Sequence, residues 1–448
     1  MTAASFHGGQ WYIADSGELL TVGDHSALLQ HLTDNPASLV CRDHHALIEL
    51  AAYLTELSAS NGEPLPGVSA RGGANGLEFG GVSFGRSRIH TGRSQLSDID
   101  CAKGKAGPRP GGPEDALWAD SAALEWQECI RHLGMRPRMS AGTTAVALLP
   151  ENWIRASRKL ATTEPWQELR SAYYGGRVQL FRQYSGPAVE FDLVNAYGSV
   201  LAGAFGYLPD SALYANREPW CDQPGWLDVT VRVDSPIAPL PYRLPERTWA
   251  IEWPKNGTWR AWYPYHELQA PGVEILQTHG AHSGRWDYAT FDAASTLLER
   301  GSSDRYTRAV VKQLLVSLAG KLAQKPILWR IWRPSEDLTD CPPDLYSFTA
   351  ESGHLDVYPV RPDRFPPSYL PQVASYITSA VRIELRDELH RAGDRAAYCD
   401  TDSIHAVAGD YRPKNYGTAP GQWHQKAAGE ARYRARRSYF VGSKRVGC

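Results

Sequence analysis

The hydrophobic pattern of the first 150 residues alternates between strand-like and helix-like periods. Short apolar runs at 10–14 and 39–41 predict strands. Apolar residues at helical spacing predict helices over 45–57 and 116–133. Gly-, Arg- and Ser-rich sequence at 67–93 and a second stretch at 103–114 predict loops between them. This half of the chain is expected to mix helices and strands.

The pattern changes near Thr163, where we expect a domain boundary. A strand over 189–193 precedes a helix over 196–205, and a Trp-, Tyr- and Pro-rich section of strands and loops covers 225–283. Helices are predicted over 304–324 and 370–391. Seven prolines between Pro342 and Pro371 predict a loop-rich connection before the second of these helices.

Composition narrows the class of protein. With 47 Lys and Arg against 49 Asp and Glu, the net charge of −2 excludes a wholly basic binder, and 42% hydrophobic residues predict a packed core. The seven cysteines form no Cys-x-x-Cys pair, which argues against a disulfide framework or a structural zinc site. No apolar run of about 18 residues is present to span a membrane. We therefore expect a soluble protein of the cytoplasm with no membrane partner.

Two aspartates lie between apolar runs at 397–407, a pattern that predicts a β-hairpin with Asp400 and Asp402 at its tip. Paired carboxylates with apolar flanks repel each other unless cations neutralise them, and oxygen ligands of this kind suit Mg²⁺. The simpler interpretation is an ordinary acidic turn. The Asp-x-Asp pattern alone does not distinguish a metal-binding hairpin from an ordinary acidic turn.

Upstream, Asp192 ends an apolar strand just before a helix that begins near Ala196. A carboxylate there can face the hairpin, and Asn195 with the first helical amides can point toward a bound anion. The alternative is that Asp192 caps the helix.

A third pattern lies on the helix predicted over 304–324. Arg308, Lys312, Val316 and Gly320 follow one another at intervals of four, so two cations and a glycine share one helix face. Such a face can hold a triphosphate, and a glycine inside a helix calls for a packing or functional reason because it costs about 1 kcal/mol relative to Ala. A solvated basic face with a packing glycine is the alternative.

In this order the three patterns resemble motifs A, B and C of the family B DNA polymerases: an aspartate strand before a Tyr-containing helix, a Lys-containing helix ending in Gly, and a Tyr-x-Asp-Thr-Asp-Ser hairpin. The segment Tyr173-Tyr174-Gly175-Gly176-Arg177 narrows the resemblance to the protein-primed branch of phages and linear plasmids, where Tyr-x-Gly-Gly joins the exonuclease and polymerase parts. Segments 239–243, 262–268 and 375–382 also look like connecting segments of that branch.

The resemblance implies an α+β fold with two domains. Residues 1–163 would form an RNase H-like, exonuclease-type domain, and 164–448 a polymerase domain. Within the latter, the palm would take 185–210 and 393–448, a terminal-protein-type insertion 211–300, and the fingers 301–392, with a reduced thumb.

The resemblance also implies site residues. Asp192 and Asp400 would bind two Mg²⁺ ions, with Mn²⁺ as an alternative ion, and Asp402 would complete the catalytic set. The residues implied for binding the incoming nucleotide are Asn195, Tyr197, Lys312, Arg308, Arg300 and Gly320. Those implied for DNA or primer contacts are Tyr173, Gly175, Gly176, Arg177, Thr401, Arg437 and Tyr439.

The chain departs from the family pattern at several positions. Asn195 and Gly198 stand where motif A usually has Ser and Pro, and Val316 and Ala319 replace the Asn and Tyr of motif B. The last substitutions remove a hydrogen-bonding group and an aromatic face, so we expect nucleotide selection to be loosened or different.

Proofreading is not expected. The family's first exonuclease motif is Asp-x-Glu on a strand, whereas Asp15 and Glu18 are three residues apart and would point to opposite faces. Asp120 resembles the aspartate of the third motif, but Ala116 replaces the motif's Tyr.

The C-terminal part is locally basic, with nine Lys or Arg against two acids in residues 404–448, which suits phosphate contacts.

The implied partners are a DNA template and primer, deoxynucleoside triphosphates and a terminal protein. We expect the terminal protein to dock within 225–283. Two rival hypotheses are a template-independent nucleotidyltransferase and a catalytically retired nucleic-acid-binding protein. Reverse transcriptase is disfavoured because Thr401 separates the two aspartates.

Overall fold

The computed structural model describes residues 2–7, 10–15, 18–35, 38–41, 44–61, 66–73, 76–84, 87–90, 114–138, 141–149, 151, 165–203, 208–209, 224–244, 251–284, 286–287, 289–324, 328–332, 342, 345–350, 353–360, 368–435, 438–442 and 444–446. The chain divides into two compact units. The first contains residues 1–144, 301–313 and 325–364, and the second contains 145–300, 314–324 and 365–448. The first unit therefore includes two segments that the sequence analysis assigned to the fingers. The expected boundary near Thr163 lies outside the described residues.

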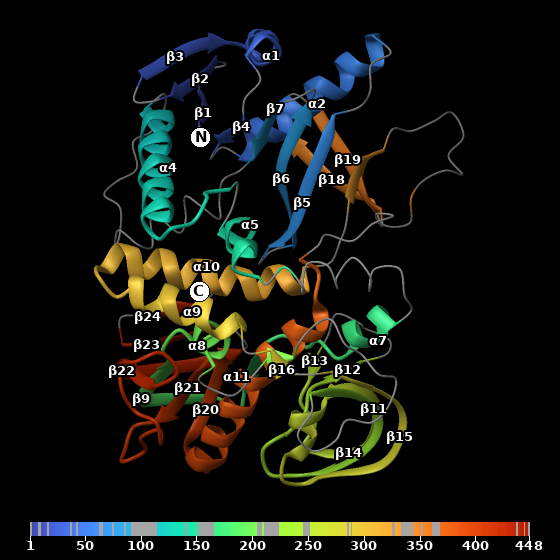
Figure 1. Ribbon diagram of the computed structural model, residues 1–448, viewed down its shortest axis with the longest axis vertical. Coiled ribbons are helices and arrows are strands. Elements are labelled where there is room, and N and C mark those ends of the chain that lie inside the picture. The colour runs from blue at the N-terminus through green and yellow to red at the C-terminus, as the bar shows by residue number, and fades with distance from the viewer. Residues whose placement is uncertain are drawn as a thin grey trace. The chain divides into compact units, whose positions relative to one another are not determined.

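The first unit is built on a ten-stranded sheet (Figure 1), whose order is β18-β19-β17-β5-β6-β7-β4-β1-β2-β3. Its strands are β1 (Thr2–His7), β2 (Gln10–Asp15), β3 (Glu18–Gly23), β4 (Ser38–Cys41), β5 (Gly67–Gly73), β6 (Gly76–Phe84), β7 (Ser87–His90), β17 (Leu328–Ile331), β18 (Tyr346–Ala350) and β19 (Gly353–Val360). β1 to β3 form an antiparallel meander, β4 runs parallel to β1, and β7 runs parallel to β4. A meander continued by two parallel strands is the RNase H-like arrangement that the sequence analysis expected.

Helices α1 (His25–Asp34), α2 (His44–Asn61) and α4 (Glu114–His132) belong to this unit. Leu47, Leu50, Ala51 and Leu54 of α2 are buried in its core together with Trp11 and Val357, which explains the apolar spacing seen in the sequence. Asp120 and Ala116 lie within α4.

Two loop predictions in this unit are wrong. The Gly-rich stretch 67–93 contains β5, β6 and β7, and Gly73 at the end of β5 pairs with Gly76 at the start of β6. The proline-rich connection between Pro342 and Pro371 contains β18 and β19, where Tyr346 pairs with Val357. The predicted loop at 103–114 lies outside the described residues except for its last one.

The second unit holds a seven-stranded sheet of order β24-β23-β22-β9-β21-β20-β8, in which early strands lie among late ones (Figure 1). Its strands are β8 (Arg177–Leu180), β9 (Tyr184–Leu193), β20 (Ala396–Thr401), β21 (Ser403–Val407), β22 (Trp423–Ala435), β23 (Ser438–Val441) and β24 (Lys444–Val446). α11 (Pro371–Ala392) contacts β20 and β21, and Glu384 of this helix accepts a hydrogen bond from Trp423 of β22 (2.9 Å). The late hairpin is thereby placed beside the early strand that carries Asp192.

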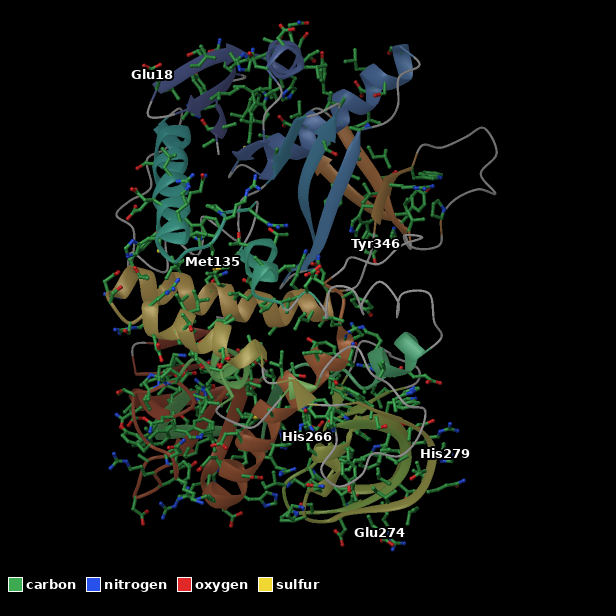
Figure 2. The ribbon with its side chains drawn as sticks, viewed as in Figure 1. Glu18, Met135, His266, Glu274, His279 and Tyr346 are labelled. Atoms are coloured by element: carbon green, nitrogen blue, oxygen red, sulfur yellow. The ribbon has the colours of Figure 1, made fainter. Side chains whose placement is uncertain are left out.

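A separate three-stranded antiparallel sheet of the second unit has the order β14-β11-β15. Its strands are β11 (Gly225–Asp234), β14 (Asn256–Pro264) and β15 (Val273–Ser283), and the short helix η2 (Tyr265–Gln269) follows β14. One face is a core that includes Val229, Val231 and Tyr263. On the outer strand β15, Glu274 and His279 point away from that core (Figure 2).

The remaining described elements connect these sheets. They are α5 (Ala141–Ala145), η1 (Val146–Leu148), α7 (Pro165–Ser171), α8 (Ala196–Leu201), β10 (Leu208–Pro209), β12 (Tyr242–Arg243), β13 (Ile251–Glu252), β16 (Trp286–Asp287), α9 (Ala289–Arg300), α10 (Arg305–Ala323) and η4 (Gly393–Arg395). α10 begins in the first unit and ends in the second. None of the helices in the described part of the chain is both long and apolar enough to span a bilayer.

Candidate active site

The predicted acidic hairpin is present as strands β20 and β21. Asp400 pairs with Ser403 across the turn, and the amide of Asp402 donates to the carbonyl of Asp400 (2.7 Å). Thr401 adopts the left-handed conformation (φ 61°), which a β-branched residue adopts only when its surroundings hold it there. The tightness of the turn places both carboxylates at one end of the sheet.

The strained Thr401 is held against the bare backbone of Gly176. Thr401 pairs with Arg177 at the start of β8, and a Cβ built on Gly176 would lie 2.6 Å from Cγ2 of Thr401. A Cβ built on the neighbouring Gly175 would meet no atom within 4 Å. The second glycine of Tyr-x-Gly-Gly is therefore the one that the hairpin requires.

Replacing Gly176 by Ala is expected to destabilise the protein by about 1–3 kcal/mol, because the new methyl group overpacks the hairpin turn. Gly175→Ala, its matched control, is expected to change the free energy of unfolding by less than about 0.5 kcal/mol. Urea unfolding of both variants checks this. Equal losses of stability in Gly176→Ala and Gly175→Ala would contradict the account. Adding Thr401→Gly to Gly176→Ala should restore most of the lost stability.

Asp192 lies beside this hairpin on the central strand β9. It pairs with Ser403, which in turn pairs with Asp400, and the amide of Leu193 donates to the carbonyl of Asp402 (2.8 Å). Residues directly opposite in an antiparallel sheet point to the same face. Asp192 and Asp400 therefore share a face, with one strand between them.

The carboxylate of Asp400 is oriented by its neighbours. The hydroxyls of Tyr398 and Thr401 donate to its two oxygens, each at 3.2 Å. Below them, the fully buried His405 lies 3.2 Å from the hydroxyl of Tyr433 and 3.3 Å from that of Ser403. No role was assigned to His405 or Tyr398 from the sequence, although Tyr398 is the Tyr of Tyr-x-Asp-Thr-Asp-Ser and His405 lies in the strand that follows it.

A cation also reaches Asp192. Nζ of Lys426, on β22, lies 3.0 Å from Oδ1 of Asp192 and 3.8 Å from Oε1 of the buried Glu190. Neither Lys426 nor Glu190 was singled out from the sequence. Glu190 lies in the strand of Asp192, but Lys426 lies in no motif, and only the pairing of β22 with β9 brings them together.

The donor set suits hard divalent cations. Asp192 and Asp400 are two strand spacings apart, about 10 Å between backbones, on the same face of the sheet. Asp192 and Asp400 would hold the divalent ions, which would supply the positive charge that two-metal nucleotidyl transfer needs. With the side chains as they stand, no three His, Cys, Asp or Glu residues within the described ranges lie close enough to hold a single ion.

The start of α8 provides a second group near the hairpin. Asn195 adopts the left-handed conformation (φ 51°), and its buried Oδ1 accepts no hydrogen bond. A Cβ on Gly198 would lie 2.5 Å from that oxygen, so the two departures from motif A are coupled by packing. Burial, with Asp402 as the next cause, raises the pKa of Tyr197 above its usual range. Tyr197 is therefore near enough to Asp402 for the two side chains to interact electrostatically.

Three of the connecting segments converge on a buried ion pair. Arg382 of α11 donates to both carboxylate oxygens of Glu267 (2.7 Å each) and to the carbonyls of Tyr174 and Gly175 (2.8 and 3.0 Å). Both charged side chains are at most 2% exposed. Arg382 thus fixes the backbone of Tyr-x-Gly-Gly, a role that the sequence analysis did not assign.

A buried histidine lies next to this pair. Nε2 of His266 is 2.7 Å from the hydroxyl of Ser379 on α11 (Figure 2). Burial, then the nearby Arg382, lowers the pKa of His266 to about 3. The imidazole is therefore neutral at physiological pH and adds no charge beside the ion pair.

Tyr173 and Arg177 flank the Tyr-x-Gly-Gly glycines differently. Tyr173 is half-buried, and burial raises its pKa. Arg177 is 1% exposed, donates to the carbonyl of Ala238 (2.9 Å) and stacks on Trp253, and burial lowers its pKa to about 10. We therefore propose a structural role for Arg177 in place of the implied DNA contact.

The face of α10 predicted from the sequence is open to solvent. Arg308, Lys312, Val316 and Gly320 are all exposed, and a Cβ on Gly320 would meet no atom within 4 Å. Gly320 therefore has no packing reason within this structure. Arg300 is exposed at the end of α9.

The last two residues implied to contact the primer are Arg437 and Tyr439. Arg437 lies outside the described residues. Tyr439 of β23 is buried among Tyr398, His405 and Tyr433, and its pKa is raised by burial first and then by Glu190, Asp400 and Asp192. We propose that its ring supports the strands that carry the carboxylates, in place of the implied primer contact.

No protein-family model matches the sequence, and no curated protein matches it either. Solved structures with the same fold include several DNA polymerase complexes. All of those we describe are of phi29 DNA polymerase. The complex with primer-template DNA has a TM-score of 0.70 at 15% identity, and the complex with primer-template DNA and incoming nucleotides has 0.67 at 16%; each covers 98% of this chain and 86% of that chain. The complex with single-stranded DNA has a TM-score of 0.67 at 15% identity, covering 96% of this chain and 83% of that chain.

The chain thus has the fold of phi29 DNA polymerase. This is the fold that the resemblance to protein-primed family B polymerases led us to expect, and the α+β class is confirmed.

Proposed function

We propose that the protein is a DNA-directed DNA polymerase that transfers nucleotides by two-metal chemistry. The observation that carries this proposal is the alignment of Asp192, Ser403 and Asp400 across three neighbouring strands, which aims two carboxylates at one face of the sheet. The match to phi29 DNA polymerase over 98% of the chain supports it.

Asp192 and Asp400 would hold the two ions, with Asp402 at the turn between β20 and β21. Two divalent ions bound there would activate the primer hydroxyl and stabilise the charge of the leaving pyrophosphate. Tyr197 would bound the pocket for the incoming sugar. Arg308 and Lys312, on the exposed face of α10, would contact the triphosphate.

The proposed partners are a DNA template, a primer and deoxynucleoside triphosphates. A terminal protein that offers a hydroxyl as primer belongs to the same proposal, with the three-stranded sheet β14-β11-β15 as its docking site. In this arrangement the exposed face of that sheet, and not the acidic hairpin, would be the surface that selects the priming protein.

Template dependence tests the proposal. On a primed homopolymer of deoxyadenosine with Mg²⁺, wild-type protein should add dTTP and reject the other three nucleotides, and it should add nothing to the primer alone. Incorporation at equal rates with and without template would favour the template-independent transferase. The feature that favours this second candidate is the exposed Val316, between Lys312 and Gly320 on the helix face. It stands where the family has a hydrogen-bonding Asn.

Replacing Gly320 by Ala is expected to raise the stability of the protein and to weaken its binding of nucleotides. Gly320→Ala should raise the free energy of unfolding by up to about 1 kcal/mol, because Ala is the better helix former and the site is open. The added methyl group should raise the KM for nucleotides if a base or sugar lies against this face. Thermal unfolding and steady-state kinetics check the two effects, and an unchanged KM would remove Gly320 from the nucleotide site.

We propose in addition that the protein does not proofread. β1, β4 and β7, the parallel strands of the first unit, contain no acidic residue that could supply paired carboxylates. Asp15 and Glu18 are on different strands and pair across the β2–β3 hairpin, so the prediction that they lie on opposite faces of one strand is wrong. Purified protein should leave a mismatched 3′ end intact in Mg²⁺, and excision of that end would refute this part.

A further inference from the structure

Lys426 reaches Asp192 because of an irregularity in β22. Along the pairing with β9, Gln425 is opposite Phe191 and Ala427 is opposite Glu190, so Lys426 is an extra residue in a β-bulge. A bulge re-aims the side chain that it carries, and bulges are frequent next to active sites. Without this bulge, residue 426 would take the place opposite Glu190, and the strand beyond it would shift by one residue.

The bulge aims a positive charge at two carboxylates of different burial. Nζ of Lys426 lies 3.0 Å from Oδ1 of Asp192 and 3.8 Å from Oε1 of Glu190. The Lys426 side chain is 42% exposed, whereas those of Asp192 and Glu190 are 8% and 0% exposed. The ammonium group therefore bridges the carboxylates from the solvent side and is free to move outward.

We propose that Lys426 is the resident counter-ion of Asp192, and that a divalent ion must displace it to bind. The inference rests on the proposed function, since it takes Asp192 as a metal ligand. Two cations cannot share Asp192 at this distance without strong repulsion. The displaced ammonium would keep its contact with Glu190 or turn to solvent. Lys426 is thus a positioning residue that sets how tightly the free protein binds metal.

A purely structural role makes a different prediction. If Lys426 served only to neutralise the buried Glu190, its loss would lower stability and leave metal affinity unchanged. Lys426→Met removes the charge and keeps most of the apolar stem, whereas Lys426→Arg keeps the charge. Lys414→Met is the matched control, because Lys414 is an exposed lysine of the same unit whose side chain makes no contact with Asp192 or Glu190.

The experiment is a titration of nucleotide-free protein with Mn²⁺, followed by electron paramagnetic resonance of the free ion. Lys426→Met should bind Mn²⁺ about tenfold more tightly than wild type, a change equivalent to about 1.4 kcal/mol. Lys426→Arg and Lys414→Met should stay within about twofold of wild type, and Asp400→Asn should bind more weakly. If Lys426→Met does not fold, Lys426→Gln takes its place, with circular dichroism as the check.

The outcomes separate the inference from the proposed function. If Lys426→Met matches wild type while Asp400→Asn weakens binding, the metal site stands and the counter-ion role is overturned. If Lys426→Arg tightens binding as much as Lys426→Met, the charge is not what matters, and the inference is also overturned. If neither wild type nor any variant binds Mn²⁺, the metal site of the proposed function fails together with the inference.

Discussion

Replacing Arg382 by Met should lower the free energy of unfolding by about 3–5 kcal/mol, because it leaves Glu267 charged and buried without its partner. The same substitution removes the donors to the carbonyls of Tyr174 and Gly175, so the backbone beside Gly176 loses its support. Urea unfolding of wild type and variant measures the change. A loss below about 1 kcal/mol would show that the ion pair does not stabilise the unit.

Two controls make this prediction specific. Arg232→Met removes one partner of an exposed ion pair with Glu274, where both side chains are more than half exposed, and should cost no more than about 1 kcal/mol. The double variant Arg382→Met with Glu267→Met leaves no unpaired buried charge. The double variant should therefore be more stable than Arg382→Met alone. If the two substitutions acted independently, their losses of stability would add, and the double variant would be the less stable of the two.

The acidic hairpin and the helix face of α10 could be predicted from the sequence because each depends on local spacing. Apolar runs on both sides of Asp400 and Asp402 specify two strands and a turn, and residues four apart on a helix share a face whatever surrounds it. Asp192 was found for the same reason, as the last polar residue of an apolar strand. The structure adds the register that aligns it with Ser403.

Other residues of the site could not be predicted, because their roles depend on long-range packing. Lys426 reaches Asp192 only through a bulge of one residue, and no spacing rule marks a bulge in this sequence. Arg382 acts through Glu267, 115 residues away along the chain. The family resemblance implied a DNA contact for Arg177, yet Arg177 is buried and contacts Ala238 and Trp253.

The first unit shows the limit of composition as a guide. Glycine and serine made 67–93 look like a loop, but β5, β6 and β7 pair with one another, and β5 pairs with β17 from a distant part of the chain. Strand pairing of this kind is decided by partners that local propensity does not reveal.

Asp400→Asn should slow nucleotide addition by at least about 10³-fold. The substitution keeps the shape of the side chain and removes the charge that would bind metal, and a loss of about 4 kcal/mol of transition-state stabilisation corresponds to that factor. Asp410→Asn is the control, since Asp410 is 87% exposed and pairs with Arg395. It should retain full activity.

The central claim is that the carboxylates of Asp192 and Asp400 carry out metal-dependent, template-directed nucleotide addition. The most direct measurement is the single-turnover rate of adding one complementary nucleotide to a primed DNA template in Mg²⁺, for wild type, Asp400→Asn and Asp410→Asn. The account predicts addition by wild type and Asp410→Asn and its loss in Asp400→Asn, with all three proteins folded. No addition by wild type on DNA, RNA or protein primers, or an unchanged rate in Asp400→Asn, would contradict it.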